Sequence, residues 1–138
     1  MGPRLQIRVL LGALAIEMCG CPGRLEDPVR FTGCPAGIDV QTALFGNTCG
    51  ASGCHNPTAL AGGLDLASAG VSSRVINHAS SSCPGQVLIS SPDSGFLFDK
   101  LLGNQACGSR MPLGLTPLTH DEIVCVESWA APFFDGGA

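Results

Sequence analysis

Cysteine is the residue type that most constrains this chain, because eight cysteines occur among its 138 residues. They stand at positions 19, 21, 34, 49, 54, 83, 107 and 125. Thiols at this density are typical of disulfide-stabilised proteins from oxidising compartments, or of sites that attach a metal or a cofactor. We therefore expect covalent cross-links to hold together whatever fold the chain adopts.

The first residues resemble an export signal, which agrees with an oxidising destination. Arg4 and Arg8 make a basic start, and residues 9–16 form an apolar run too short to cross a bilayer. The run that follows is similar to a bacterial lipoprotein cleavage site, with lipid attached to Cys21. Residues 1–20 are thus predicted to be a signal peptide, with ordinary cleavage nearby as the alternative. We expect an exported, lipid-anchored protein in the periplasm, the outer membrane or at the cell surface.

The rest of the chain is long enough for one small domain. Residues 21–33 show no clear period and are interpreted as a tether, leaving 34–138 as the domain. Apolar residues make up 45% of the sequence, charged residues only 13%, and there are 19 glycines and 10 prolines. This mixture favours an all-α domain of short helices joined by long, turn-rich loops.

Two helices are expected before the C-terminal one. Apolar side chains at helical spacing predict a helix over residues 38–48. A second is predicted over residues 91–102, with Ser91 as its cap and Gly103 as its end.

The C-terminal helix has the clearest signals. Thr119 and Glu122 form a capping-box pattern, and Pro132 is expected to end the helix. The apolar stripe that follows the cap consists of Ile123, Val126 and Ala130, with Trp129 beside it.

The central motif is Cys49-Gly-Ala-Ser-Gly-Cys54-His55. In c-type cytochromes two thiols bind the haem vinyl groups and the next histidine binds the iron, usually as C-x-x-C-H. Here four residues separate the cysteines, and Gly50 and Gly53 give the backbone the freedom to loop out. The motif therefore predicts haem attachment, with a Cys49–Cys54 disulfide and a surface histidine as the alternative.

A second iron ligand is available from Met111, which precedes Pro112 in the loop CGSRMPLG. Thioether sulfur is a soft ligand, and His/Met ligation raises the reduction potential of a haem. The alternative is that Met111 only fills space in a loop. His78 and His120 are expected to be surface histidines.

Taken in order, these segments resemble the planctomycete-type cytochrome c domain. The resemblance rests on LF-x-x-x-C…CH, GGLDL, SPDSGFLFDKLLG, RMP and LTHDEIVCVESWAAP, and it covers about residues 38–132. It implies a small helical cytochrome c-like fold with one covalent haem c and an electron-transfer function. His55 and Met111 would then be the axial ligands, and Cys49 and Cys54 the attachment points. The partner would be a redox protein that the sequence does not identify.

Four cysteines remain as disulfide candidates: Cys34, Cys83, Cys107 and Cys125. Four cysteines allow three pairings, and spacing does not select among them. The pairing we favour is Cys107–Cys125 with Cys34–Cys83, because the first bridge would tie the Met111 loop to the last helix. The alternative is Cys83–Cys107 across the second helix.

Other classes of function find little support in the sequence. The net charge of −4 and the single lysine, Lys100, leave no basic patch for nucleic acid. There is no G-x-S-x-G motif and no paired-carboxylate arrangement, so we do not expect an enzyme.

Two alternatives to the cytochrome function stay open. One is a haem-free, disulfide-rich exported lipoprotein that acts as a binding or structural module. The other is a zinc site built from Cys49, Cys54, His55 and a further cysteine.

Overall fold

The computed structural model describes Cys34 and residues 37–136. Its helical elements are η2 (Val40–Cys49), η3 (Ala61–Gly63), α1 (Ser72–Val75), α2 (Phe96–Leu102), α3 (His120–Ala130) and η4 (Ala131–Phe133). The predicted signal peptide over 1–20, the lipidation site at Cys21 and the tether over 21–33 lie outside the described residues.

Helix η2 confirms the first predicted helix, with small shifts at both ends. It begins after Asp39, whose carboxylate accepts the amide of Thr42 at 3.2 Å and so satisfies an N–H that the helix leaves unpaired. Its winding is wider than that of an α-helix, and the amide of Gly50 reaches the carbonyl of Phe45 at 2.7 Å. The buried face carries Val40, Leu44 and Phe45.

Helix α2 is shorter than predicted, and Ser91 does not cap it. Ser91 instead pairs with Ser94 in a tight turn, and the helix begins after Gly95. The first amides of the helix donate to carbonyls outside it. Phe96 donates to the carbonyl of Val87 at 2.8 Å, and Leu97 donates to the carbonyl of Leu88. The start of α2 is therefore set by tertiary contacts. Its end at Gly103, with φ of 88°, is the left-handed stop that was predicted.

Helix α3 confirms the capping box. The hydroxyl of Thr119 accepts the amide of Glu122 at 3.3 Å, while the Glu122 carboxylate accepts the amide of Thr119 at 2.7 Å. The predicted stripe is buried, with Val126 and Ala130 fully covered. The α-helix ends at Ala130, and Pro132 lies in the short turn η4 that continues it.

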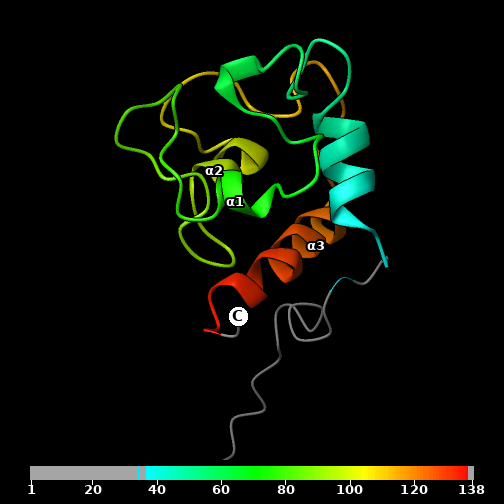
Figure 1. The fold of residues 1–138 in the computed structure, drawn as a ribbon, viewed down its shortest axis with the longest axis vertical. Helices are drawn as coiled ribbons and strands as arrows, with labels where there is room; N and C mark the ends of the chain where they lie inside the picture. Colours follow the sequence, from blue (N-terminus) through cyan, green and yellow to red (C-terminus); the bar gives the residue numbers. More distant parts are fainter. Residues whose placement is uncertain (1–33, 35–36, 137–138) are drawn as a thin grey trace, which may run out of the picture.

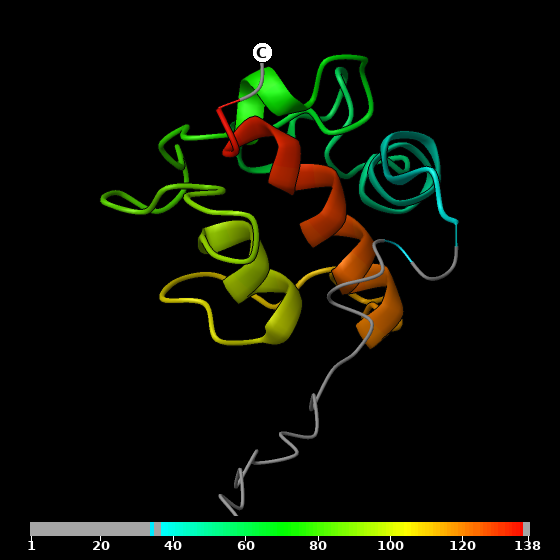
Figure 2. The same ribbon diagram turned by 90° about the horizontal axis from the view of Figure 1, so that it is seen from below.

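The core forms where α3 crosses η2 (Figures 1 and 2). Trp129 of α3 packs edge-on against the Phe45 ring, with ring centroids 5.0 Å apart and planes at 83°. Such pairs stabilise by about 0.5–1.5 kcal/mol beyond the area they bury. Other buried members of the core are Leu66, Val71, Val75, Ile89, Leu97, Phe98 and Leu101, which come from α1, α2 and the loops around them.

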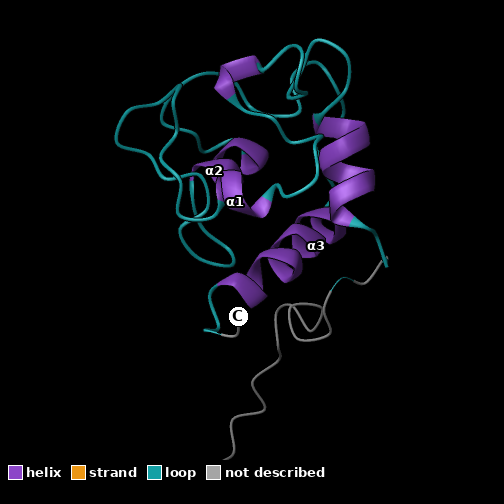
Figure 3. Cartoon of the chain, viewed as in Figure 1, coloured by secondary structure: helices purple, strands orange, loops and turns teal. Residues whose placement is uncertain are grey.

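Loops form most of the remaining chain, as the composition predicted (Figure 3). No strand occurs over residue 34 and residues 37–136, where pairing is limited to isolated bridges such as Ile76 with Ile89. The architecture is compatible with the small helical domain expected. Within these same ranges, no helix combines the length and apolar character that crossing a membrane requires.

The disulfides correct the pairing that the sequence favoured. Cys34 bonds to Cys125 and Cys83 bonds to Cys107, so the favoured bridges Cys107–Cys125 and Cys34–Cys83 are both wrong, and the alternative bridge Cys83–Cys107 is confirmed. The physical reason is that Cys125 lies fully buried in α3 and faces the start of the domain. In a chain-entropy model the 91-residue and 24-residue separations correspond to about 4.5 and about 3.5 kcal/mol of stabilisation. The bridges are compatible with the predicted export to an oxidising compartment.

Candidate functional site

The Cys49–His55 motif begins on the last residue of η2 and closes on itself. The backbone amide of His55 donates to the carbonyl of Cys49 at 3.0 Å, and the amide of Cys54 donates to Ala51 at 3.0 Å. A Cβ at Gly50 would lie only 2.6 Å from the Cβ of Ala67, so no residue but glycine fits there unless its neighbours move. The four-residue spacer is thus a compact turn.

Asn56 stabilises this turn, a role that was not predicted from the sequence. Its side-chain amide donates to the carbonyl of Ala51 at 2.9 Å. Its side-chain oxygen accepts the amides of Thr58 and Ala59 at 3.0 and 2.8 Å. The available signal was Asn-Pro directly after His55, a common way to begin a turn.

The two motif cysteines differ from the other described cysteines. Cys49 and Cys54 remain free thiols, and both are partly buried. Cys49 packs against the core, and this burial, together with the charge of nearby Cys54, raises its pKa from 9.0 to about 11. The structure therefore does not contain the alternative Cys49–Cys54 disulfide.

A cavity of about 520 Å³ opens next to the motif. His55 and Met111 both line it, although Met111 comes 56 positions after His55 in the sequence. Its mainly apolar walls include Ala61, Leu64, Leu88, Phe96, Leu97 and Leu113. Cofactor pockets in proteins typically measure about 300–1,000 Å³, with a few polar groups among apolar walls. The cavity has the size and character of such a pocket.

A smaller cavity of about 100 Å³ shares His55, Ala61, Met111 and Leu113 with the larger one. Cys49, Cys54 and Pro112 also line it. The predicted site residues Cys49, Cys54, His55 and Met111 therefore all border this smaller space. Two exposed leucines also line it, Leu113 with 66% and Leu115 with 54% of the residue surface accessible.

The imidazole of His55 has an unusual environment. Its Nδ1 atom is buried, and no partner within hydrogen-bond distance exists for it among the described residues. Buried polar atoms almost always have a partner, so this nitrogen calls for one that the described residues do not provide. An imidazole that lines a cavity and has a ring nitrogen without a protein partner can bind a metal through nitrogen.

These residues fit a covalently attached haem. The group requires two thiols, an adjacent histidine, a second axial ligand and an apolar cavity, and each is present at the same place. Cys49, Cys54 and His55 would hold it from the motif side, and Met111 would provide the thioether.

A zinc site fits less well than a haem. In the described part of the chain no group of three or more His, Cys, Asp or Glu side chains is arranged to hold a metal ion. Structural zinc requires four such ligands in a tetrahedron, whereas haem iron takes only axial ligands from the protein.

The other histidines occupy different surroundings. His78 is exposed, as predicted, but it also borders the 520 Å³ cavity beside the serines at 80–82. His120 is exposed in the first turn of α3, as predicted. Nothing in the sequence around His78 indicated that its loop would fold over the cavity.

A comparison of this chain with protein-family models finds no match, and comparisons with curated proteins and solved structures find none either. Its function must therefore be inferred from the residues of the site.

Proposed function

We propose that this protein is a mono-haem c-type cytochrome-like electron carrier. Cys49 and Cys54 attach the haem, His55 binds its iron, and Met111 is the second axial ligand. The single observation that carries the proposal is the convergence of these four side chains on one small cavity next to a cofactor-sized one. The fold that goes with this function is a small cytochrome c-like helical domain.

The chemistry of each ligand supports this role. Haem supplies a metal that gains and loses one electron, and the protein determines the potential through the axial ligands and burial. The unpartnered Nδ1 of His55 and the apolar walls favour a metal over bulk water as the neighbour of the imidazole. A carrier of electrons needs no substrate-binding catalytic groups, so we propose no enzymatic activity.

The partner and the location follow from the same proposal. Leu113 and Leu115 are exposed and line the smaller cavity, where a redox partner protein can approach the haem. We place the protein outside the cytoplasm, exported by residues 1–20 and anchored to a membrane by lipid on Cys21. The two disulfides support an oxidising compartment.

The test is production of the full chain in a bacterial host with the cytochrome c maturation system. A protein with a sharp Soret band and haem stain that survives denaturing electrophoresis supports the proposal. A folded, colourless product would instead favour the haem-free binding or structural module.

A further inference from the structure

The loop that carries Met111 is hydrogen-bonded to α2 at several points. We call residues 104–111 the methionine loop. At its far end the amide of Met111 donates to the carbonyl of Lys100 at 2.9 Å, and the Arg110 side chain donates to the carbonyl of Leu101 at 3.1 Å. The backbone of Met111 is therefore held against α2.

The Lys100 side chain, from the only lysine in the sequence, lies under the middle of this loop. Its ammonium group donates to the carbonyls of Cys107 and Ser109 at 2.9 and 3.1 Å, and it stands 5.0 Å from the ring centroid of Phe96. Hydrogen bonds from a charged donor are stronger than neutral ones, and the aromatic face favours the cation further. Gly108 leaves room for it, since a Cβ there would lie 2.6 Å from the ammonium nitrogen.

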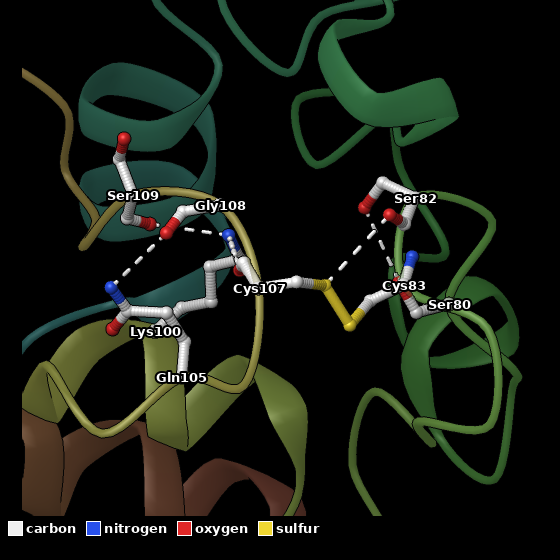
Figure 4. Close-up of a disulfide and its surroundings, with 8 residues drawn as sticks. All are labelled: Ser80, Ser82, Cys83, Lys100, Gln105, Cys107, Gly108 and Ser109. Atoms are coloured by element: carbon white, nitrogen blue, oxygen red, sulfur yellow. Dashed lines mark hydrogen bonds between the residues drawn. A yellow bond between two sulfur atoms is a disulfide. The ribbon is translucent and has the colours of Figure 1, made fainter.

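The Cys83–Cys107 disulfide attaches the same loop to the segment that carries Ser80, Ser82 and Cys83 (Figure 4). Cys83 is a firm anchor, because it is only 5% exposed and its amide donates to the hydroxyl of buried Ser80 at 3.2 Å. Cys107 and the serines at 80–82 themselves line the 520 Å³ cavity. The bridge therefore joins two segments that line the cavity, only four residues before Met111.

We propose that the Cys83–Cys107 disulfide and Lys100 are positioning groups for Met111. Neither needs to touch the iron. Together they hold the methionine loop against α2, so that Met111 stays at the cavity that it lines together with His55. The inference rests on the proposed function for its ligand chemistry, but the restraint on the loop is a property of the chain itself.

The experiment compares two disulfide variants of the full-length protein. Cys83→Ala/Cys107→Ala removes the bridge at the cavity, and Cys34→Ala/Cys125→Ala removes the other bridge as a matched control. Because the control bridge closes the longer stretch of chain, its loss should lower overall stability at least as much. Only the first variant should weaken the red absorption band of iron–methionine ligation and speed carbon monoxide binding to the reduced protein.

A second readout does not depend on haem. Hydrogen exchange of the Met111 amide should become at least about tenfold faster in Cys83→Ala/Cys107→Ala and in Lys100→Ala, since the loop opens locally. Lys100→Arg, which keeps the charge and the donors, should restore slow exchange. Lys100→Ala carries the test on its own if the double variant does not fold.

The outcomes separate this inference from the proposed function. A protein without haem contradicts the function, while the exchange rates still decide the inference. A haem protein whose Met111 band and amide exchange are unchanged in the Cys83/Cys107 and Lys100 variants overturns the inference alone. Equal losses in both disulfide variants also overturn it, because the bridge would then act only through overall stability.

Discussion

The backbone amide of His55 donates to the carbonyl of Cys49 at 3.0 Å, across the turn formed by residues 50–54. This bond places the histidine at the end of η2, next to the first cysteine, despite the unusual length of the motif. The extra residues form a turn that Asn56 holds from outside. The turn therefore accommodates the longer spacer, and Cys49, Cys54 and His55 all line the smaller cavity.

The geometry of this turn makes Gly50 sensitive to substitution. We expect Gly50→Ala to lower the free energy of unfolding by about 1–3 kcal/mol, because the new methyl group would overlap Ala67 and the carbonyl of Gly46. The yield of attached haem should fall with it. Urea unfolding and haem absorbance per mole of protein measure the two effects.

Gly53→Asn is the matched control for that variant. Gly53 has φ of +79°, and no atom lies within 4 Å of the place where a Cβ would stand. Asparagine tolerates this backbone conformation better than most residues, so we expect a cost below about 1 kcal/mol. Equal stability of Gly50→Ala and the unmodified protein would show that the turn is not packed as described.

Substitution of the two proposed axial ligands should separate their roles. His55→Ala should prevent stable haem incorporation, because the iron then lacks the ligand next to the attachment site. Met111→Ala should keep the haem but abolish the weak absorption near the red end and lower the reduction potential. Optical spectra and a redox titration measure these effects.

His78→Ala is the control for the substitutions of the two proposed axial ligands, since His78 borders the same cavity. We expect its spectrum and potential to match those of the unmodified protein. If Met111→Ala leaves the spectrum unchanged while His78→Ala alters it, then His78 is the axial ligand and the assignment of Met111 is wrong.

The raised pKa of Cys49 predicts a pH dependence in protein made without haem. Below pH 9.0 the thiol is protonated in both the folded and the unfolded states, so it does not change stability. As the pH rises from 9.0 toward 11, the unfolded chain loses this proton first, and the stability of the fold decreases. Unfolding free energies measured across this interval should fall more steeply for the unmodified chain than for Cys49→Ser.

The haem-bearing protein provides the complementary result. A thioether has no proton to lose, so the difference between pH 9 and pH 11 that arises from Cys49 should disappear once haem is attached. A Cys49 contribution that persists after attachment would contradict the proposed bond to this sulfur.

The capping box predicts a moderate, purely structural effect. Thr119→Ala removes the hydroxyl that accepts the Glu122 amide at 3.3 Å, and we expect a loss of about 1 kcal/mol in stability. Thr116→Ala, in the exposed loop before the helix, should leave stability unchanged to within about 0.5 kcal/mol. Similar losses from both substitutions, measured by thermal or urea unfolding, would show that the cap does not stabilise α3.

Local signals explain which elements could be predicted from the sequence. The cap and stripe of α3 lie within a few turns of one another, so Thr119, Glu122 and Val126 identify the helix without knowledge of the fold. The start of α2 could not be predicted in this way. Its first amides are satisfied by Val87 and Leu88, and Ser91 is occupied in a separate turn.

Long-range features were the least predictable. The disulfide pairing depends on which loops meet in space, and the spacing of Cys34, Cys83, Cys107 and Cys125 contains no such information. The approach of Met111 to His55 was anticipated only from the order of the motifs. The contacts of Lys100 with the methionine loop and the position of His78 at the cavity had no sequence signal, because each depends on how distant loops fold together.

Intact mass of the mature protein is the most direct test of the central claim. The protein should be produced with cytochrome c maturation and measured after denaturation without reductant. We predict a mass increased by one haem, lost in Cys49→Ala/Cys54→Ala, together with the two disulfides Cys34–Cys125 and Cys83–Cys107. A folded protein whose mass shows no haem, and whose Cys49 and Cys54 are joined to each other, would contradict the account.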